Sequence, residues 1–172
     1  MKKAFLKLLV ASSLSLAASE VKAQNLITIN NSFEQGKIGW NFSGTNTQLI
    51  NQDGHTGSSS LKLVSKEGSL TYFYTEPKVQ KFTLSAGKKY ELKMWVKPLT
   101  KIREVEIRVY ATTGFKAEQD IAETYRNKNL KVNEWQEISI PFTGKDYPEA
   151  KFSIAIGVSE VLFDDIMLVE VK

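Results

Sequence analysis

Residues 89–97 alternate strictly between two kinds of side chain. The apolar members share one side of an extended chain: Tyr90, Leu92, Met94 and Val96. A period of two predicts a β-strand with one buried face. Trp95 is a large aromatic residue on the other side, where its neighbours are charged. We expect an inner strand of a sheet. Because Trp95 lies on its outer face, we expect that face to hold a functional site rather than ordinary solvent-exposed surface.

Short stretches of similar character recur along the chain, separated by turn clusters rich in Gly, Asn, Asp and Ser. The predicted strands are 26–30, 40–43, 48–50, 60–64, 70–75, 78–84, 103–111, 135–142, 151–158 and 161–171. The best helical window, 117–125, has Ile121 isolated among polar neighbours, so it is predicted as loop or irregular strand. The pattern indicates an all-β fold, specifically a β-sandwich.

The N-terminus has the composition of a secretory signal peptide. Two lysines follow Met1, an apolar run covers residues 8–18, and residues 21–23 form a small-x-small cleavage site. The apolar run is too short for a membrane span. We expect residues 1–23 to be removed and residues 24–172 to form one domain, secreted or periplasmic.

Charge and cysteine content exclude several classes of protein. The chain has 23 basic and 19 acidic residues, of which four basic and one acidic belong to residues 1–23. The remaining 19 and 18 nearly cancel, which argues against a nucleic-acid or anionic-membrane partner. The absence of cysteine excludes disulfides, thiolate metal sites and a cysteine nucleophile.

Catalytic residue sets are weakly represented. Glu104 and Glu106 share one side of a predicted strand among basic residues, which is typical of a solvated face rather than of facing catalytic carboxylates. The single histidine, His55, lies in a Gly- and Ser-rich turn where a general base would not be held rigidly. The residues therefore give only a weak signal for an enzyme.

The last predicted strand carries two adjacent acids, Asp164 and Asp165. Strict alternation would place Asp164 on the apolar side with Ile166 and Leu168. A buried carboxylate needs a partner, and either a calcium ion or backbone amides would serve. Glu34 would reach the same place if the first and last strands are neighbours.

Two further strands have outer faces of unusual composition. Arg108 and Tyr110 alternate with apolar residues in one, and the other has small residues outside, Ser153 and Ala155. Together with Trp95 these residues predict a shallow groove with an aromatic and charged rim. The alternative is that the small residues merely lie under a loop.

One ordered set of short segments covers nearly the whole chain after residue 24. The set consists of Asn25-Leu26-Ile27, Asn31-Ser32-Phe33-Glu34, Gly39-Trp40, His55-Thr56-Gly57-Ser58, Leu61-Lys62-Leu63, Gly87-Lys88-Lys89-Tyr90, Trp95-Val96-Lys97, Trp135 with Ile140 and Phe142, and Phe163-Asp164-Asp165-Ile166 with Leu168. In this combination the chain resembles the secreted carbohydrate-binding modules of families four, nine and twenty-two.

The resemblance implies a jelly-roll β-sandwich of the galactose-binding-domain-like type with a structural calcium ion. Side-chain oxygens for the ion would come from Glu34 and Asp164, and backbone carbonyls from Ser32 and from the turn at His55 and Ser58. It also implies structural roles in the core for Trp40 and Trp135.

The function implied is non-catalytic binding of a polysaccharide or oligosaccharide in a groove on the concave sheet face, by aromatic stacking. The expected carbohydrate-binding residues are Tyr72, Tyr74, Trp95, Arg108, Tyr110, Phe115, Gln119 and Tyr125. Trp95 has two open assignments, as a ligand-facing ring or as a ring packed under a loop. The resemblance implies that the protein is not an enzyme, at most an accessory to glycoside hydrolases, with a separately encoded glycoside hydrolase as an expected partner. Two alternatives remain: an extracellular adhesion module without a sugar site, and a jelly-roll glycosidase or lyase.

Overall fold

The computed structural model describes residues 23–43, 46–67, 71–76, 78–101, 105–111, 125–127, 129–156 and 159–171. For strand residues 43, 105–111, 125–127, 148–149 and 151–152 only the backbone is described. This part of the chain contains eleven strands: β1 Trp40–Ser43, β2 Thr47–Asn51, β3 Ser59–Ser65, β4 Thr71–Thr75, β5 Phe82–Leu84, β6 Lys89–Pro98, β7 Val105–Ala111, β8 Tyr125–Asn127, β9 Gln136–Thr143, β10 Tyr147–Ile156 and β11 Ser159–Val171. Within the described ranges, no helix is long and apolar enough to cross a membrane.

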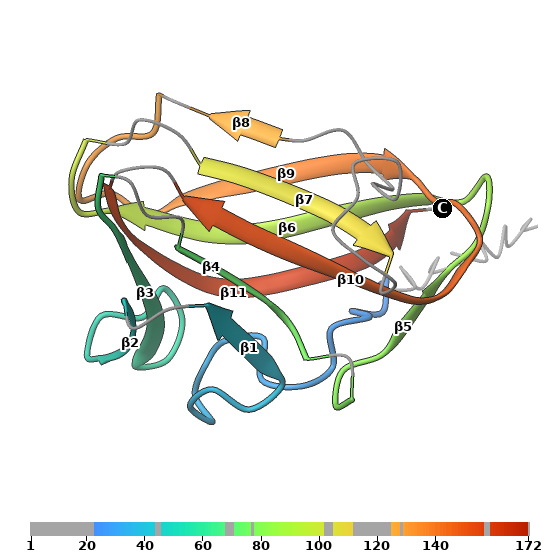
Figure 1. Cartoon of the computed structure of the whole chain (residues 1–172), viewed down its shortest axis with the longest axis horizontal. Helices are drawn as coiled ribbons and strands as arrows, with labels where there is room; N and C mark the ends of the chain where they lie inside the picture. The colour runs from blue at the N-terminus through green and yellow to red at the C-terminus, as the bar shows by residue number, and fades with distance from the viewer. Residues whose placement is uncertain are drawn as a thin grey trace, which may run out of the picture.

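The strands form two antiparallel sheets packed face to face (Figure 1). Sheet A has the order β2-β3-β11-β6-β9. Sheet B has the order β1-β4-β10-β7-β8, with β5 paired to β10 beyond β4. In Figure 1 sheet B lies in front of sheet A. The predicted all-β sandwich is confirmed.

Strand β6 follows the alternation in the sequence. It lies inside sheet A between β11 and β9. Its apolar residues are buried at 2% exposure or less, and the residues between them are half-buried or exposed. A half-buried strand of this kind stabilises the fold through its inner face, where each side chain packs against the opposite sheet.

Aromatic rings fill the space between the sheets near β1, β4 and β11. Phe73 lies at the centre of this group, with ring-centroid distances of 5.5 Å to Trp40 and 5.3 Å to Phe163. Trp40 is 4% exposed, and its indole N–H donates to the backbone oxygen of Asn30 over 3.0 Å. Because buried tryptophan needs such an acceptor, the core role predicted for Trp40 is confirmed.

The first segment of the domain runs beside the last strand without forming a regular strand. Asn25 makes a single bridge to Val169, and Leu26 N–H donates to the Leu168 carbonyl over 2.7 Å. Further along, Ile166 N–H donates to the Asn31 carbonyl over 2.9 Å. The predicted strand at 26–30 is therefore wrong, but the predicted contact between the first and last segments is present.

A β-bulge in β11 changes which residues face the core. The pairing with β6 shifts between Asp164 and Met167, and Asp165 has a φ of 47°. Before the bulge Val161 and Phe163 belong to the core, so Asp164 lies on the outer face of sheet A, directly opposite Trp95. The prediction that Asp164 shares a face with Ile166 and Leu168 is wrong, because the extra residue of a bulge breaks the period of two.

Candidate functional site

Cross-strand pairing brings several of the predicted sugar-binding positions together on sheet B. Tyr74 of β4 pairs with Ser153 of β10, which in turn pairs with Arg108 of β7. In the next row Tyr72 pairs with Ala155. Directly opposed residues of an antiparallel pair lie on the same side of the sheet. These rows alternate with buried Phe73 and Ile154, so they belong to the outer face.

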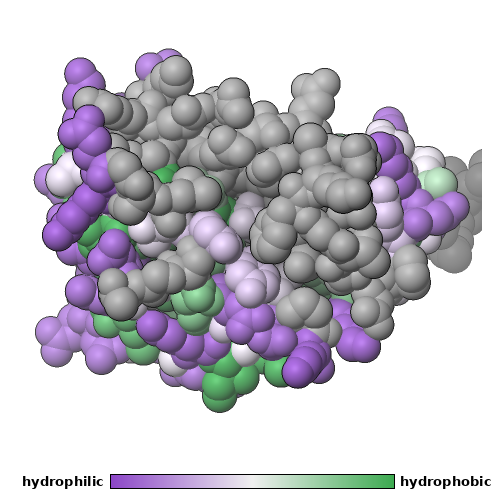
Figure 2. Space-filling model, in the orientation of Figure 1, coloured by the Kyte–Doolittle hydropathy of each residue, from purple (hydrophilic) through white to green (hydrophobic). Residues whose placement is uncertain are grey.

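The two tyrosines form a contiguous aromatic surface. Their ring centroids lie 6.2 Å apart and the ring planes are tilted by 31°. Both side chains are half-buried, as are Ser153 and Ala155 beside them. In the centre of Figure 2, over β4 and β10, the surface is pale rather than strongly hydrophilic. The outer face of sheet B thus places two neighbouring tyrosine rings beside small side chains.

The other predicted positions of this groove are described less fully. Tyr110 pairs with Lys151 in the outer-face rows, whereas Tyr125 pairs with Ile107, in the same row as buried Ile154. The strand pairing therefore puts Tyr125 in a different cross-strand row from Tyr72 and Tyr74, on the side that faces the core. Phe115 and Gln119 lie outside the described residues.

Trp95 lies on the opposite sheet from Tyr72 and Tyr74. Its ring stacks on the His55 ring, with centroids 3.7 Å apart and planes 11° apart. His55 belongs to the loop between β2 and β3, which crosses the outer face of sheet A. The predicted groove shared by Trp95, Arg108 and Tyr110 is therefore wrong, and the packed-under-a-loop assignment of Trp95 describes its surroundings.

Trp135 also lies beside His55, on the outer side of sheet A and outside the core. It is half-buried, and its ring meets the His55 ring edge-on at a centroid distance of 5.8 Å. Lys97 lies over the Trp135 ring at 6.0 Å and forms an ion pair with Asp53 over 2.8 Å. The core role predicted for Trp135 is wrong, since the residue precedes β9 and packs on the outer side of sheet A.

The five residues predicted to hold calcium come from segments that the fold brings together. Glu34 is bonded to the loop before β3: its Oε1 accepts the backbone N–H groups of Ser58 at 2.9 Å and of Ser59 at 2.6 Å. The Ser59 amide, as the largest of several effects, holds the pKa of Glu34 below its ordinary value. Ser32 lies two residues before Glu34, in the same turn.

Asp164 anchors the other side of the same loop. It is fully buried, and its Oδ2 accepts the backbone N–H groups of His55 at 2.7 Å and of Thr56 at 3.2 Å. Its Oδ1 accepts the N–H of Asp165 at 2.8 Å. Of the two partners left open for Asp164, the backbone amides are therefore present.

Sequence reasoning missed the contribution of Asp165 to this junction. Its Oδ2 lies 2.7 Å from Nδ1 of His55, and its Oδ1 accepts the Thr56 hydroxyl over 2.6 Å. The adjacent pair of acids was the signal that could have revealed it. We call the junction formed by Glu34, Asp164 and Asp165 with the loop 55–59 the carboxylate clasp.

The carboxylate and backbone carbonyl oxygens of the clasp are of the kind that a calcium ion takes as ligands. Burial raises the pKa of Asp164 to about 6, and the charge of Asp165 adds to the rise, so three amide bonds do not fully offset the cost of ionising this acid. A bound cation would supply positive charge there. Among the described residues no three His, Cys, Asp or Glu side chains group around a common point, so backbone carbonyls would have to complete the set.

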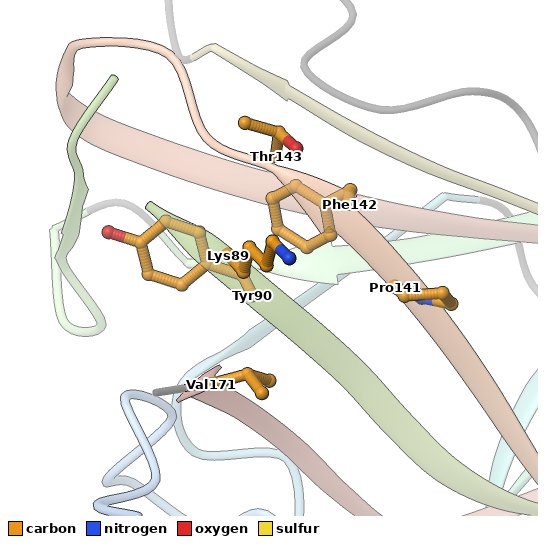
Figure 3. A pocket seen from close by; sticks show the side chains of 6 residues that line it. All are labelled: Lys89, Tyr90, Pro141, Phe142, Thr143 and Val171. Carbon is orange, nitrogen blue, oxygen red and sulfur yellow. The ribbon is translucent and has the colours of Figure 1, made fainter. Parts of the chain in front are cut away.

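A separate hollow of about 330 Å³ lies where β6, β9 and β11 meet (Figure 3). It is lined by Lys89, Tyr90, Pro141, Phe142, Thr143 and Val171. The rings of Tyr90 and Phe142 are only 2% and 9% exposed and stack on each other, with centroids 5.6 Å apart. They offer no free face for a sugar, so this hollow is not a candidate stacking site.

The sequence and fold both match known carbohydrate-binding proteins. Residues 25–160 match the family model CBM_4_9, described as a carbohydrate binding domain. No match was found among proteins with curated descriptions. Agreement with the family model supports the expectation that the chain is not an enzyme.

Several solved structures share the fold. The family 16 carbohydrate binding module-2 is 22% identical with a TM-score of 0.62, covering 85% of this chain and all of its own. TmCBM61 in complex with β-1,4-galactotriose is 18% identical with a TM-score of 0.63, covering 87% and 100%. The CBM22-1–GH10 modules of Clostridium thermocellum xylanase 10B, complexed with xylohexaose, are 21% identical with a TM-score of 0.58, covering 83% and 28%. The chain therefore belongs to the CBM_4_9 family of carbohydrate-binding domains, as a non-catalytic module with a two-sheet jelly-roll fold.

Proposed function

We propose that the outer face of sheet B binds a polysaccharide or oligosaccharide by stacking sugar rings on Tyr72 and Tyr74. The observation that carries the proposal is the pairing register, which sets this tyrosine pair beside the small residues Ser153 and Ala155. Arg108, one strand further on, orients the sugar through charge-assisted hydrogen bonds.

The free energies of stacking and association show that binding needs more than one aromatic ring. A ring and a sugar that hide roughly 100 Å² between them gain about 2.5 kcal/mol at 25 cal/mol per Å². Association itself costs at least about 4 kcal/mol. Two tyrosines together offset that cost, and polar contacts supply the net affinity. We expect dissociation constants between about 10 μM and about 1 mM, which correspond to roughly −7 to −4 kcal/mol.

A structural calcium ion at the carboxylate clasp is part of the same proposal. Glu34 and Asp164 supply carboxylate oxygens, and Ser32, His55 and Ser58 supply backbone carbonyls. Support comes from the convergence of these segments and from the buried, incompletely stabilised acid at Asp164. The amide bonds to both carboxylates provide an alternative that needs no ion. Bound calcium would tie the loop 55–59 to β11 and would take no part in sugar recognition.

We further propose that the module acts outside the cytoplasm, in the periplasm or as a secreted protein, after removal of residues 1–23. There it binds its polymer, and a separately encoded glycoside hydrolase is a partner to test. Support comes from the signal-peptide composition of the N-terminus. Oligosaccharides such as β-1,4-galactotriose and xylohexaose, which are bound in two structures of the same fold, are suitable first ligands to test.

Affinity electrophoresis against a panel of polysaccharides, backed by a glycan array, tests the proposal. We expect retardation on at least one polymer, loss of it in Tyr72→Ala and Tyr74→Ala, and retention of it in Tyr72→Phe. Trp135→Ala is the matched control, because it removes a half-buried ring from the other sheet. Thermal melts establish that each variant is folded. The absence of retardation on every polymer and of binding to every glycan would favour an adhesion module instead, and new reducing ends would indicate an enzyme.

A further inference from the structure

Asn41 lies beside Tyr74 on the outer face of sheet B. It belongs to β1, the strand at one edge of that sheet, and pairs directly with Tyr74 of β4. Ser153 of β10 pairs with Tyr74 from the other side. The chain neighbours of Asn41 point inward, since Trp40 is buried and Phe42 packs against the core. A row of Asn41, Tyr74 and Ser153 therefore crosses three strands, with the tyrosine in the middle.

The polar groups on the two sides of Tyr74 are not used by the fold. Both side chains are half-buried, and within the described ranges neither the Asn41 amide nor the Ser153 hydroxyl takes part in a hydrogen bond. Asn30 is different, because its side-chain amide makes three hydrogen bonds to the backbone of its own turn, residues 35–38. Asn30 thus stabilises a turn, whereas the donor and acceptor groups of Asn41 are left for a ligand.

The two tyrosines differ in what β10 places beside them. Tyr74 pairs with Ser153, which carries a hydroxyl, and Tyr72 pairs with Ala155, which carries a methyl group. A methyl group packs against a sugar but forms no hydrogen bond with it. On the β10 side, polar contacts to a bound sugar are therefore available at Tyr74 and not at Tyr72.

We infer that Asn41, assisted by Ser153, selects the sugar unit that stacks on Tyr74 by the orientation of its hydroxyl groups. The inference rests on the proposed function and adds a specificity-determining residue to the same site. A pyranose stacked on the ring directs its equatorial hydroxyls sideways and its axial hydroxyls along the ring normal. Because neighbouring strands lie about 4.8 Å apart, the side chains of β1 and β10 stand at the sides of that sugar, toward its equatorial hydroxyls.

An asparagine amide is suited to two adjacent hydroxyls. Its NH₂ group donates to one and its carbonyl oxygen accepts from the other, since a hydroxyl can both donate and accept. An axial hydroxyl at either position breaks one of these bonds and leaves a polar group of the site unpaired, which is how binding sites discriminate most strongly. The unit over Tyr74 therefore carries two adjacent equatorial hydroxyls on its Asn41 side.

Calorimetric titration with a set of oligosaccharides tests the inference. The set is xylohexaose, cellohexaose, mannohexaose, β-1,4-galactotriose and the oligosaccharide of the polymer that retards the protein most in electrophoresis. Cellohexaose and mannohexaose share one linkage and differ in the orientation of the C2 hydroxyl.

Asn41→Leu keeps the approximate size of the side chain and removes its hydrogen-bonding groups. It should weaken binding of the preferred oligosaccharide about tenfold, the loss expected for one net hydrogen bond. Binding of the others should weaken less, so the spread of affinities narrows. Ser153→Ala should act in the same direction with a smaller effect, because it removes a single hydroxyl.

Asn51→Leu is the matched control. Asn51 is exposed on β2, an edge strand of the other sheet, so its loss should change neither the affinities nor their spread. Thermal melts of both leucine variants should lie close to that of the unaltered protein, because both side chains point away from the core.

The outcomes separate this inference from the function on which it rests. Unchanged affinities in Asn41→Leu, with loss of binding in Tyr74→Ala, overturn the role of Asn41 and leave sugar binding in place. An equal loss for every oligosaccharide in Asn41→Leu overturns the selective role as well. Failure of every polymer and oligosaccharide to bind the unaltered protein overturns both proposals.

Discussion

The outer faces of the two sheets show how differently one sandwich treats an outward-facing aromatic residue. On sheet A the Trp95 ring is stacked against His55 from a loop that three carboxylates fasten down. On sheet B the rings of Tyr72 and Tyr74 lie against each other beside small side chains. Strand parity identifies residues that leave the core, but it does not reveal that a loop packs on the ring, as it does at Trp95.

The largest loss of stability should follow from removing the buried carboxylate that holds the loop 55–59. Asp164→Ala leaves the N–H groups of His55, Thr56 and Asp165 without their acceptor, and each such loss costs about 1–3 kcal/mol. We expect the free energy of unfolding to fall by at least about 3 kcal/mol in urea denaturation. Sugar binding on sheet B should persist while the protein is folded. A loss below about 1 kcal/mol would show that the clasp does not hold the loop.

A glycine in the loop offers a matched test of the other end of the clasp. Gly57 has a φ of 70°, and a Cβ added there would lie 2.6 Å from Oε1 of Glu34. Gly87 has a similar φ of 77° but nothing within 4 Å of the added atom. Both alanine variants carry the backbone strain of about 1–2 kcal/mol, so Gly57→Ala should be the less stable of the two. Equal melting temperatures would mean that Glu34 moves aside without cost.

A calcium ion at the carboxylate clasp would stabilise the loop on sheet A and would leave the sugar-binding face of sheet B unchanged. Chelation with EDTA should lower the melting temperature by several degrees, and added Ca²⁺ should restore it, since an ion that binds only the folded state stabilises it. Affinity for sugar at a temperature well below the melt should be unchanged. A melt that is identical with EDTA and with calcium would leave the amide hydrogen bonds as the whole explanation of the clasp.

The smallest effect should come from the stacked histidine. His55→Ala removes a ring that covers one face of Trp95 and also the partner of Asp165 Oδ2. Aromatic contacts of this kind contribute about 0.5–1.5 kcal/mol beyond their area, and a hydrogen bond contributes a similar net amount. We expect a modest loss of stability in urea denaturation and no change in sugar affinity. If this variant instead gained a new sugar site, Trp95 would be a latent ligand-binding ring.

Local patterns in the sequence were enough to predict the sandwich. The alternation in 89–97 matches β6, and the bounds of β1, β3 and β11 lie within two residues of prediction, because burial of one face imposes a period of two. Resemblance to known modules predicted the family, which the match over residues 25–160 confirms. The same alternation puts Tyr72 and Tyr74, two residues apart in the predicted strand 70–75, on one face, and both were expected among the sugar-binding residues.

Longer-range relations were not predictable in the same way. Parity places Asp164 on the wrong face because the bulge at Asp165 adds a residue that no alternation reveals. It also cannot say that β6 and β7, which follow one another in sequence, belong to different sheets, so Trp95 and Arg108 were grouped wrongly. The packing of His55 on Trp95 depends on a loop, and loop conformation is set by tertiary contacts rather than by periodicity.

We expect sugar to bind to sheet B and to leave sheet A undisturbed. An NMR titration tests it most directly, with the oligosaccharide of the polymer that retards the protein most in electrophoresis. The account predicts the largest amide shift changes within residues 71–75 and 153–156, with little change at residues 53–58 and 95–97. Shift changes centred on the loop at His55 and on Trp95, with β4 and β10 unaffected, would contradict it.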